Sequence, residues 1–186
     1  MPRTARLTRD DWAAAALDAL AEGGPPAVAV EPVAARLGAS KSSFYWLFDN
    51  RQALLAAALE RWERVQTDEI LPWLAALPPA ERLRRLVHHA FADTTGRGDL
   101  ALRLLTESAD PLVREVTERV TERRLAVLES AFTALGHPPE AARHYAMAGY
   151  SAYLGAAALR HTPSAPADPA AYIDTILRAF GVPAED

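Results

Sequence analysis

Apolar residues recur every three or four positions along most of the chain, which is the spacing of one face of a helix. The first such stripe consists of Trp12, Ala16, Leu17 and Leu20. No stretch shows the sustained alternation of a half-buried strand, and the abundant alanine, leucine, arginine and glutamate favour helix. The pattern therefore predicts an all-α protein.

Prolines and glycines indicate where the helices begin and end. Thr8 and Asp11 have the spacing of a capping box, so the first helix is expected to begin at Thr8 and to stop at residues 23–26, Gly-Gly-Pro-Pro. The further helices are expected at about 32–37, 41–47, 51–72, 79–94, 100–108, 111–136 and 138–161, with a last one ending at Gly181. Short helices give way to long ones near residue 50, which predicts two domains, residues 1–52 and 53–186.

The segment from residue 28 to residue 48 has the pattern of a helix-turn-helix. Gly38 supplies the left-handed conformation of a tight turn, and Ala34 leaves room for two helices to cross closely. Val33, Leu37 and Phe44 then close a small core between the helices. The second helix of such a motif enters the major groove of DNA.

The exposed face of that second helix is small and polar, which suits a close approach to DNA. Its residues are Ser40, Lys41, Ser42, Ser43 and Tyr45. The Lys41 amine can donate to guanine O6 and N7, and hydroxyls can bind phosphates or bases. Lys41 is also the only lysine in the chain, which reflects either a general bias toward arginine or a need for lysine at this position.

The run from Val33 to Leu55 resembles the DNA-binding signature of the TetR (tetracycline-repressor) family. Its apolar-Ala-x-x-x-Gly core, Ser-Lys-x-Ser helix start and Tyr-x-x-Phe ending are in register, and a basic residue then leads into an Ala-Leu-Leu helix. The first helix and its Gly-Gly ending lie at the expected distance upstream. The resemblance is specific for residues 8–58, and beyond them it extends only to length and helix number.

This resemblance implies a role in DNA binding for the matching positions. Lys41 and Ser42 would face base edges; Ser43, Tyr45 and Arg51 would contact phosphates; Trp46 would pack or touch the DNA backbone. Helix packing is the alternative for the two aromatic residues. The sequence departs from the family pattern at three positions: Leu47 replaces a common histidine, Ala29 a threonine that binds phosphate, and Arg51 the usual lysine.

The N-terminal segment is electrically balanced, with six Lys/Arg and six Asp/Glu in residues 1–52. Non-specific DNA affinity is therefore expected to be modest and strongly dependent on salt. Arg3 and Arg6, together with Arg9, form either an arm that reaches the neighbouring groove or a solvated terminus.

The resemblance assigns residues 53–186 to a larger helical domain for ligand sensing and dimerisation. Small and apolar residues at helical spacing predict a dimer interface, with packing within the subunit as the alternative. Its residues would be Ala142, Ala146, Gly149, Tyr153, Ala156, Ile173, Ile176 and Phe180. Candidates for an apolar effector pocket, each of which could equally be plain core, are Trp62, Phe91, Leu105, Phe132, Met147 and Tyr150. The charged residues from Arg114 to Arg123 are expected to form a solvated helix face.

Other chemistry is not indicated. The chain has no cysteine, which excludes a disulfide scaffold, a cysteine nucleophile and thiolate metal sites. We find no phosphate loop, nucleophile elbow or metal-ligand cluster, so we expect no enzyme activity, metal or cofactor. No secretory signal or membrane-spanning run is found, and we expect a cytoplasmic protein.

The motif and the resemblance together predict a DNA-binding transcriptional regulator. It would be a homodimer that binds a palindromic operator in double-stranded DNA and is released by a small apolar effector. The alternative is a regulator that binds a protein partner and in which DNA binding has weakened, as the departures at Leu47 and Ala29 would allow.

Overall fold

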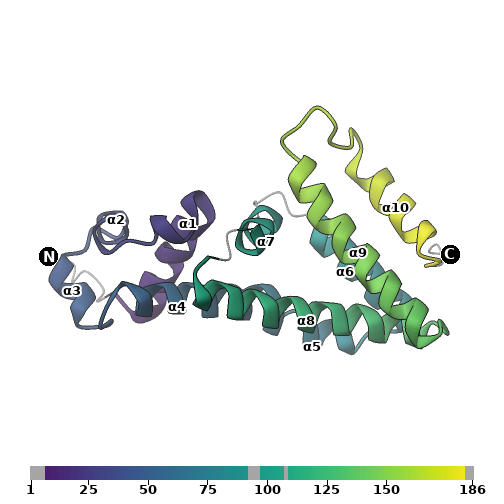
Figure 1. Cartoon of the computed structure of the whole chain (residues 1–186), viewed down its shortest axis with the longest axis horizontal. Coiled ribbons are helices and arrows are strands. Elements are labelled where there is room, and N and C mark those ends of the chain that lie inside the picture. Colours follow the sequence, from purple (N-terminus) through teal and green to yellow (C-terminus); the bar gives the residue numbers. More distant parts are fainter. Residues whose placement is uncertain (1–6, 92–96, 107–108, 183–186) are drawn as a thin grey trace, which may run out of the picture.

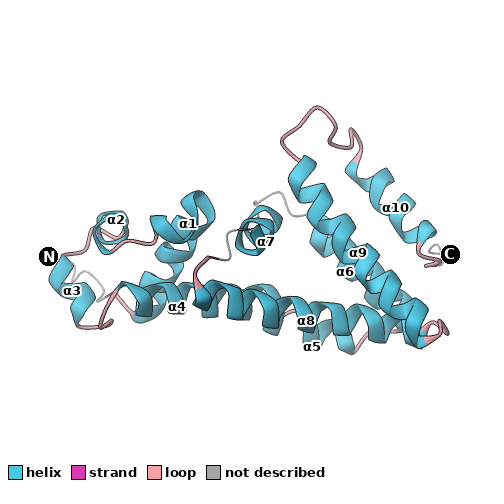
Figure 2. Cartoon of the chain, in the orientation of Figure 1, coloured by secondary structure: helices cyan, strands magenta, loops and turns pink. Residues whose placement is uncertain are grey.

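The computed structural model describes residues 7–91, 97–106 and 109–182, and every regular element in these ranges is a helix (Figure 2). The all-α prediction is confirmed. The elements are α1 (Arg9–Ala27), α2 (Val30–Arg36), α3 (Lys41–Tyr45), α4 (Arg51–Glu63), the π-helical segment η1 (Arg64–Asp68), α5 (Leu71–Ala75), α6 (Pro79–Phe91), α7 (Arg97–Thr106), α8 (Pro111–Ala134), α9 (Pro139–Leu159) and α10 (Pro169–Ala179).

Most helix boundaries lie where the capping signals predict them. The Thr8 hydroxyl accepts a bond from the Asp11 amide at 3.2 Å, and the Asp11 carboxylate accepts one from the Thr8 amide at 2.7 Å, which completes the capping box. The bond from the Thr8 amide, together with one from the Thr8 hydroxyl, lowers the pKa of the Asp11 carboxyl group. At the other end, Gly24 (φ 69°) kinks α1, and residues 25–27 add one more turn instead of ending the helix.

Other boundaries differ from the prediction, such as the start of α7 at Arg97 and the end of α3 at Tyr45. The second helix begins at Val30, so Pro32 is its third residue rather than its first. The helix expected over 51–72 is divided into α4, η1 and α5, because the backbone widens to a π turn in which the Glu69 amide bonds to the Arg64 carbonyl at 3.0 Å. This change of pitch begins well before Pro72.

The molecule is elongated (Figure 1). Helices α1, α2 and α3 form a head at one end, and α4 leads away from it beside α8. At the other end α9 packs along α8, and α10 lies against α6. None of the helices in the described ranges is long and apolar enough to cross a membrane.

Two apolar clusters hold these helices together. The first joins the head to α4, α7 and the start of α8, through buried residues that include Trp12, Phe44, Leu55, Leu104 and Val116. The second lies among α6, α8, α9 and α10 and includes Leu83, Phe132, Ala146, Tyr150 and Leu177. Residue 52, where the sequence suggests a domain boundary, lies in the first turn of α4, and the first cluster continues past it.

Candidate nucleic-acid interface and ligand cavity

The turn between α2 and α3 is held by local bonds. Gly38 has φ +59°, a conformation that strains any residue with a side chain. The Ala39 amide bonds to the Ala34 carbonyl at 2.9 Å. Ser40 then caps α3, because its hydroxyl accepts from the Ser43 amide at 3.2 Å. This arrangement is a helix-turn-helix with α3 as its second helix.

Phe44 fixes the position of α3 against the rest of the head. Its side chain is fully buried, with its ring centroid 5.5 Å from that of Trp12 and 5.4 Å from that of Phe48. The predicted core residue Val33 is buried in the same cluster, and Leu37 packs against it half-buried. One face of α3 is thereby committed to the core, and the opposite face is left to solvent.

Most of the α3 side chains that are predicted to contact DNA lie on its outer face, which is exposed to solvent. Lys41 and Ser42 are exposed, and Tyr45 is 58% exposed. Trp46, directly after the helix, is 79% exposed, so packing within the chain does not explain it. Ser43 differs, because it is half-buried and its hydroxyl donates to the Ser40 carbonyl at 2.6 Å.

Lys41 has a partner that the sequence reasoning missed. Its amine lies 2.7 Å from a carboxylate oxygen of Glu31 on α2. The bond raises the pKa of Lys41 and lowers the pKa of Glu31. An acidic residue in the first turn of α2 and a lysine at the start of α3 were the signal that could have revealed the pair.

Other basic residues of the head also have partners within the chain. Arg51 donates to the Pro25 carbonyl and is half-buried, so it holds the end of α1 against the start of α4. Arg9 donates to the Leu47 carbonyl at 3.0 Å and lies 4.5 Å from the Phe48 ring centroid, which places it in the first turn of α1 rather than in an arm. Arg36 pairs with Glu22. Arg3 and Arg6 lie outside the described residues.

Two of the three departures from the family pattern, Leu47 and Ala29, replace polar side chains of the head by apolar ones. Leu47 is half-buried and packs against the first apolar cluster, where a histidine would have a polar ring. Ala29 is the N-cap of α2 and makes no side-chain cap bond. A threonine there could cap the helix.

A cavity opens among η1, α6, α8, α9 and α10, with an empty volume of about 970 Å³ counting the part open to solvent. Of the predicted pocket residues, Phe91, Phe132 and Tyr150 line it. Trp62 instead belongs to the first apolar cluster, and Met147 is 52% exposed on α9. Leu105 packs half-buried against the second cluster without lining the cavity.

The residues predicted to form a dimer interface face the inside of the subunit. Ala142, Ala146 and Ile173 are buried in the second apolar cluster. Gly149, Tyr153, Ile176 and Phe180 line the cavity, and Ala156 is half-buried. This face thus packs largely within the subunit, and its assignment to a dimer interface stays a prediction. The small residues let α9 approach its neighbours in the same subunit, which was the alternative.

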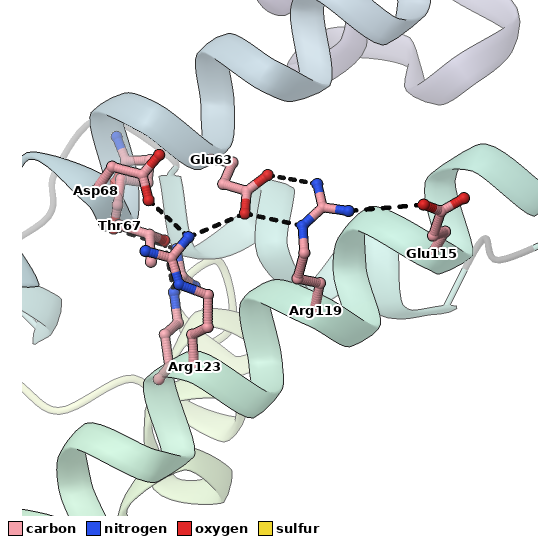
Figure 3. Close-up of polar contacts among 8 residues, drawn as sticks. Glu63, Thr67, Asp68, Glu115, Arg119 and Arg123 are labelled. Carbon is pink, nitrogen blue, oxygen red and sulfur yellow. Dashed lines mark hydrogen bonds and ion pairs between the residues drawn. The ribbon is translucent and has the colours of Figure 1, made fainter.

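The expected solvated face of α8 is also wrong in part (Figure 3). Arg119 and Arg123 of α8 both bind the Glu63 carboxylate, at 2.5 and 3.0 Å, and the Glu63 side chain is only 10% exposed. Arg123 also contacts Asp68 at 2.6 Å. These bonds, that from Arg119 first, lower the pKa of Glu63. The network joins α8 to the junction of α4 and η1. Within the described ranges no group of three His, Asp or Glu side chains could hold a metal ion.

Comparisons with known proteins agree with the geometry of the head. Residues 13–58 match the model of the bacterial regulatory proteins of the tetR family. An uncharacterized HTH-type transcriptional regulator of Bacillus subtilis (strain 168), YerO, is 31% identical over 101 residues, which are 53% of this chain and 35% of that protein. The chain thus matches about a third of the length of this curated relative.

Solved structures share the whole architecture. A transcriptional regulator from Streptomyces coelicolor A3(2) is 27% identical with a TM-score of 0.63, over 92% of this chain and 97% of that one. A regulator from Saccharomonospora viridis in complex with choline is 17% identical with a TM-score of 0.73, over 93% of each chain; at that identity the likeness concerns the fold alone. The helix-turn-helix head thus lies in the region that matches the tetR-family model, and the chain as a whole is similar in fold to solved regulators.

Proposed function

We propose that this chain is a homodimeric repressor that binds a palindromic operator through α3 and is released by a small apolar effector. The observation that carries the proposal is the outward face of α3. Lys41, Ser42 and Tyr45 are exposed there, on a helix that Gly38 and Phe44 hold in the helix-turn-helix arrangement. A dimer would present two such helices about one turn of DNA apart.

The pair between Lys41 and Glu31 bears on how the operator would be recognised. In the free protein the Lys41 amine is held by a carboxylate, which also repels phosphates. On binding DNA, a guanine edge would replace Glu31 as the partner of Lys41. Only a DNA site with a guanine at the matching position would compensate the loss of the Lys41–Glu31 ion pair. The remaining Glu31 charge would weaken binding to all sequences, which favours discrimination over raw affinity.

The test is fluorescence anisotropy with DNA from upstream of the gene, over a salt series. We expect Lys41→Ala to weaken operator binding by about tenfold or more and to relax discrimination at one base pair per half-site. Glu31→Gln should tighten binding to operator and unrelated DNA alike. Arg114→Ala, which removes an exposed arginine of α8 outside the head, is the matched control and should change neither.

An equal loss of affinity on all sequences in Lys41→Ala would contradict base readout and indicate a phosphate contact. If no DNA were bound selectively at low salt, even in a search of genomic fragments, the repressor proposal would fail. The alternative of a protein partner would then be preferred, because Trp46 is 79% exposed and can anchor an interface.

For the dimer we propose the outward face of α9, since the inward face is occupied. After Arg143, its exposed residues recur with helical spacing and are small or apolar, except for one histidine. They are His144, Met147, Ala148, Ser151, Gly155, Ala158 and Leu159. Glu140 and Arg143 are also exposed, near the start of the helix. Met147 and Leu159 are 52% and 45% exposed, which is unusual for large apolar side chains on a single chain. A second α9 can approach such a face closely.

Ser151→Arg is expected to convert the dimer to a monomer, because the arginine would place a bulky charge at the centre of this face. Ser130→Arg, an equally exposed serine on α8, is the control and should remain dimeric. Light scattering coupled to gel filtration measures both masses. A dimer that survives Ser151→Arg would exclude this face.

The cavity supports the effector part of the proposal. Its lining includes residues of both α8 and η1, and η1 continues α4 from the head. A ligand that binds one arrangement of these helices preferentially would change the separation of the two heads. The regulator from Saccharomonospora viridis, which shares the fold, is in complex with choline, a small molecule.

A further inference from the structure

The described lining of the cavity contains a positively charged side chain but no negatively charged one. Most of its lining is aliphatic or aromatic, contributed by residues such as Leu83, Phe91, Phe132 and Leu177. Among the described residues that line it, Arg124 is the one fixed cation, and none is an aspartate or glutamate. An apolar cavity with one uncompensated cation favours a ligand that carries one negative charge.

The neighbours of Arg124 leave its charge without a carboxylate. Of three arginines in this part of α8, Arg119 and Arg123 take the carboxylates of Glu63 and Asp68. The guanidinium of Arg124 has only uncharged partners. They are the Thr67 hydroxyl at 3.3 Å, the Gln66 carbonyl at 3.4 Å and the Trp62 ring, whose centroid is 5.3 Å away. Both hydrogen bonds are long, so a carboxylate would be a stronger partner.

A second polar group lies on the same side. The Tyr150 side chain lines the cavity, and its hydroxyl has a long contact of 3.4 Å with the Thr121 hydroxyl. Thr121 and Arg124 are three residues apart on α8, and side chains at that spacing are neighbours on a helix surface. The cavity thus has a polar wall at this part of α8, and apart from His89 of α6 its lining toward α6 and α10 is apolar.

We propose that the cavity binds a small molecule with an apolar body and a single carboxylate, whose carboxylate is held by Arg124 and the Tyr150 hydroxyl. This inference rests on the proposed function, since it identifies the chemical class of the effector. The planar guanidinium matches a carboxylate with two parallel bonds. A carboxylate would take Arg124 away from Gln66 and Thr67, which belong to η1, the segment that follows α4. Binding would therefore act directly on the helix that leads to the head.

The test compares three probes with the same chain and different heads: octanoate, 1-octanol and octyltrimethylammonium. Isothermal titration calorimetry on the full chain without DNA measures their affinities. We expect octanoate to bind about tenfold or more tightly than octanol, because a charge-assisted bond exceeds a neutral one. Octyltrimethylammonium should bind most weakly, since Arg124 repels it.

Variants assign the preference to Arg124. Arg124→Gln should abolish the difference between octanoate and octanol, and Arg124→Lys should keep part of it. Arg114→Gln, at an exposed position of the same helix, is the control and should behave as the parent chain. Thermal melting followed by circular dichroism verifies that each variant is folded.

The inference would be overturned by equal affinity for octanoate and octanol, by tighter binding of octyltrimethylammonium, by absence of binding of all three probes, or by an unchanged preference in a folded Arg124→Gln. The comparison of probes on the parent chain decides the matter even if that variant does not fold. The calorimetry contains no DNA, so a negative result in it does not affect the operator-binding experiment. Equally, a failure to bind an operator would not affect a measured preference for octanoate.

Discussion

Replacing Phe44 by alanine is expected to lower the free energy of unfolding by about 3–5 kcal/mol and to abolish operator binding. The Phe44 ring is fully buried and packs against Trp12 and Phe48, with the rings of Phe44 and Phe48 nearly parallel at an interplanar angle of 13°. The lost ring leaves a cavity between α1 and α3, which can be filled only if one of these helices moves. Since α3 carries the proposed DNA contacts, its displacement removes them together.

Denaturant unfolding followed by circular dichroism measures this loss. Tyr45→Ala, at the next position but 58% exposed, is the matched control and should change stability by about 0.5 kcal/mol or less. Similar losses for the two variants would show that α3 is not anchored by its buried face.

Replacing Glu63 by glutamine is expected to cost about 2–3 kcal/mol of unfolding free energy. Removing one member of a fully buried ion pair costs about 3–5 kcal/mol, and the value here is lower because Arg119 and Arg123 are 43% and 41% exposed. Glutamine keeps the shape of the side chain but leaves two arginines facing a neutral group. Glu115→Gln is the control, because Glu115 is 74% exposed and lies 3.7 Å from Arg119. A change of about 0.5 kcal/mol or less is expected for it.

The Glu63 effect should depend on pH in a defined direction. The pKa of Glu63 in the folded protein is held below its usual value by its bonds to Arg119 and Arg123. The carboxylate therefore contributes its full stabilisation above the usual glutamate pKa of about 4.3, and the contribution is lost as the pH falls through the lowered folded pKa. The difference between the parent chain and Glu63→Gln should be constant near neutral pH and shrink in acid. A difference that grew as the pH fell would contradict this account.

Local signals explain why the head could be predicted from the sequence. The capping box at Thr8, the N-cap at Ser40 and the left-handed glycine at Gly38 each act within a few residues. Such signals depend little on the rest of the fold. The order and direction of α1, α2 and α3, and the outward face of α3, follow from them.

The candidate cavity was predictable only in part. Phe91, Phe132 and Tyr150 line it as expected, but Trp62 is buried elsewhere. An apolar residue at helical spacing is expected to face the interior, but the spacing does not show which of the two apolar clusters it belongs to. The role of Arg124 was not predicted, because it depends on Arg119 and Arg123 binding the nearby carboxylates of Glu63 and Asp68.

The sequence by itself determined the helices, the turn at Gly38 and the polar face of α3, because these depend on residues close together in the chain. Only the tertiary structure decided which face of α9 lies inside the subunit, that Glu31 holds Lys41, and that Arg124 keeps an uncompensated charge at the cavity. The physical reason is the same in each case. A stripe of small residues can pack against a helix of the same subunit or against a helix of a partner subunit. A charged side chain can pair with a residue that is distant in the sequence. Only the packing of distant helices decides which of these contacts form.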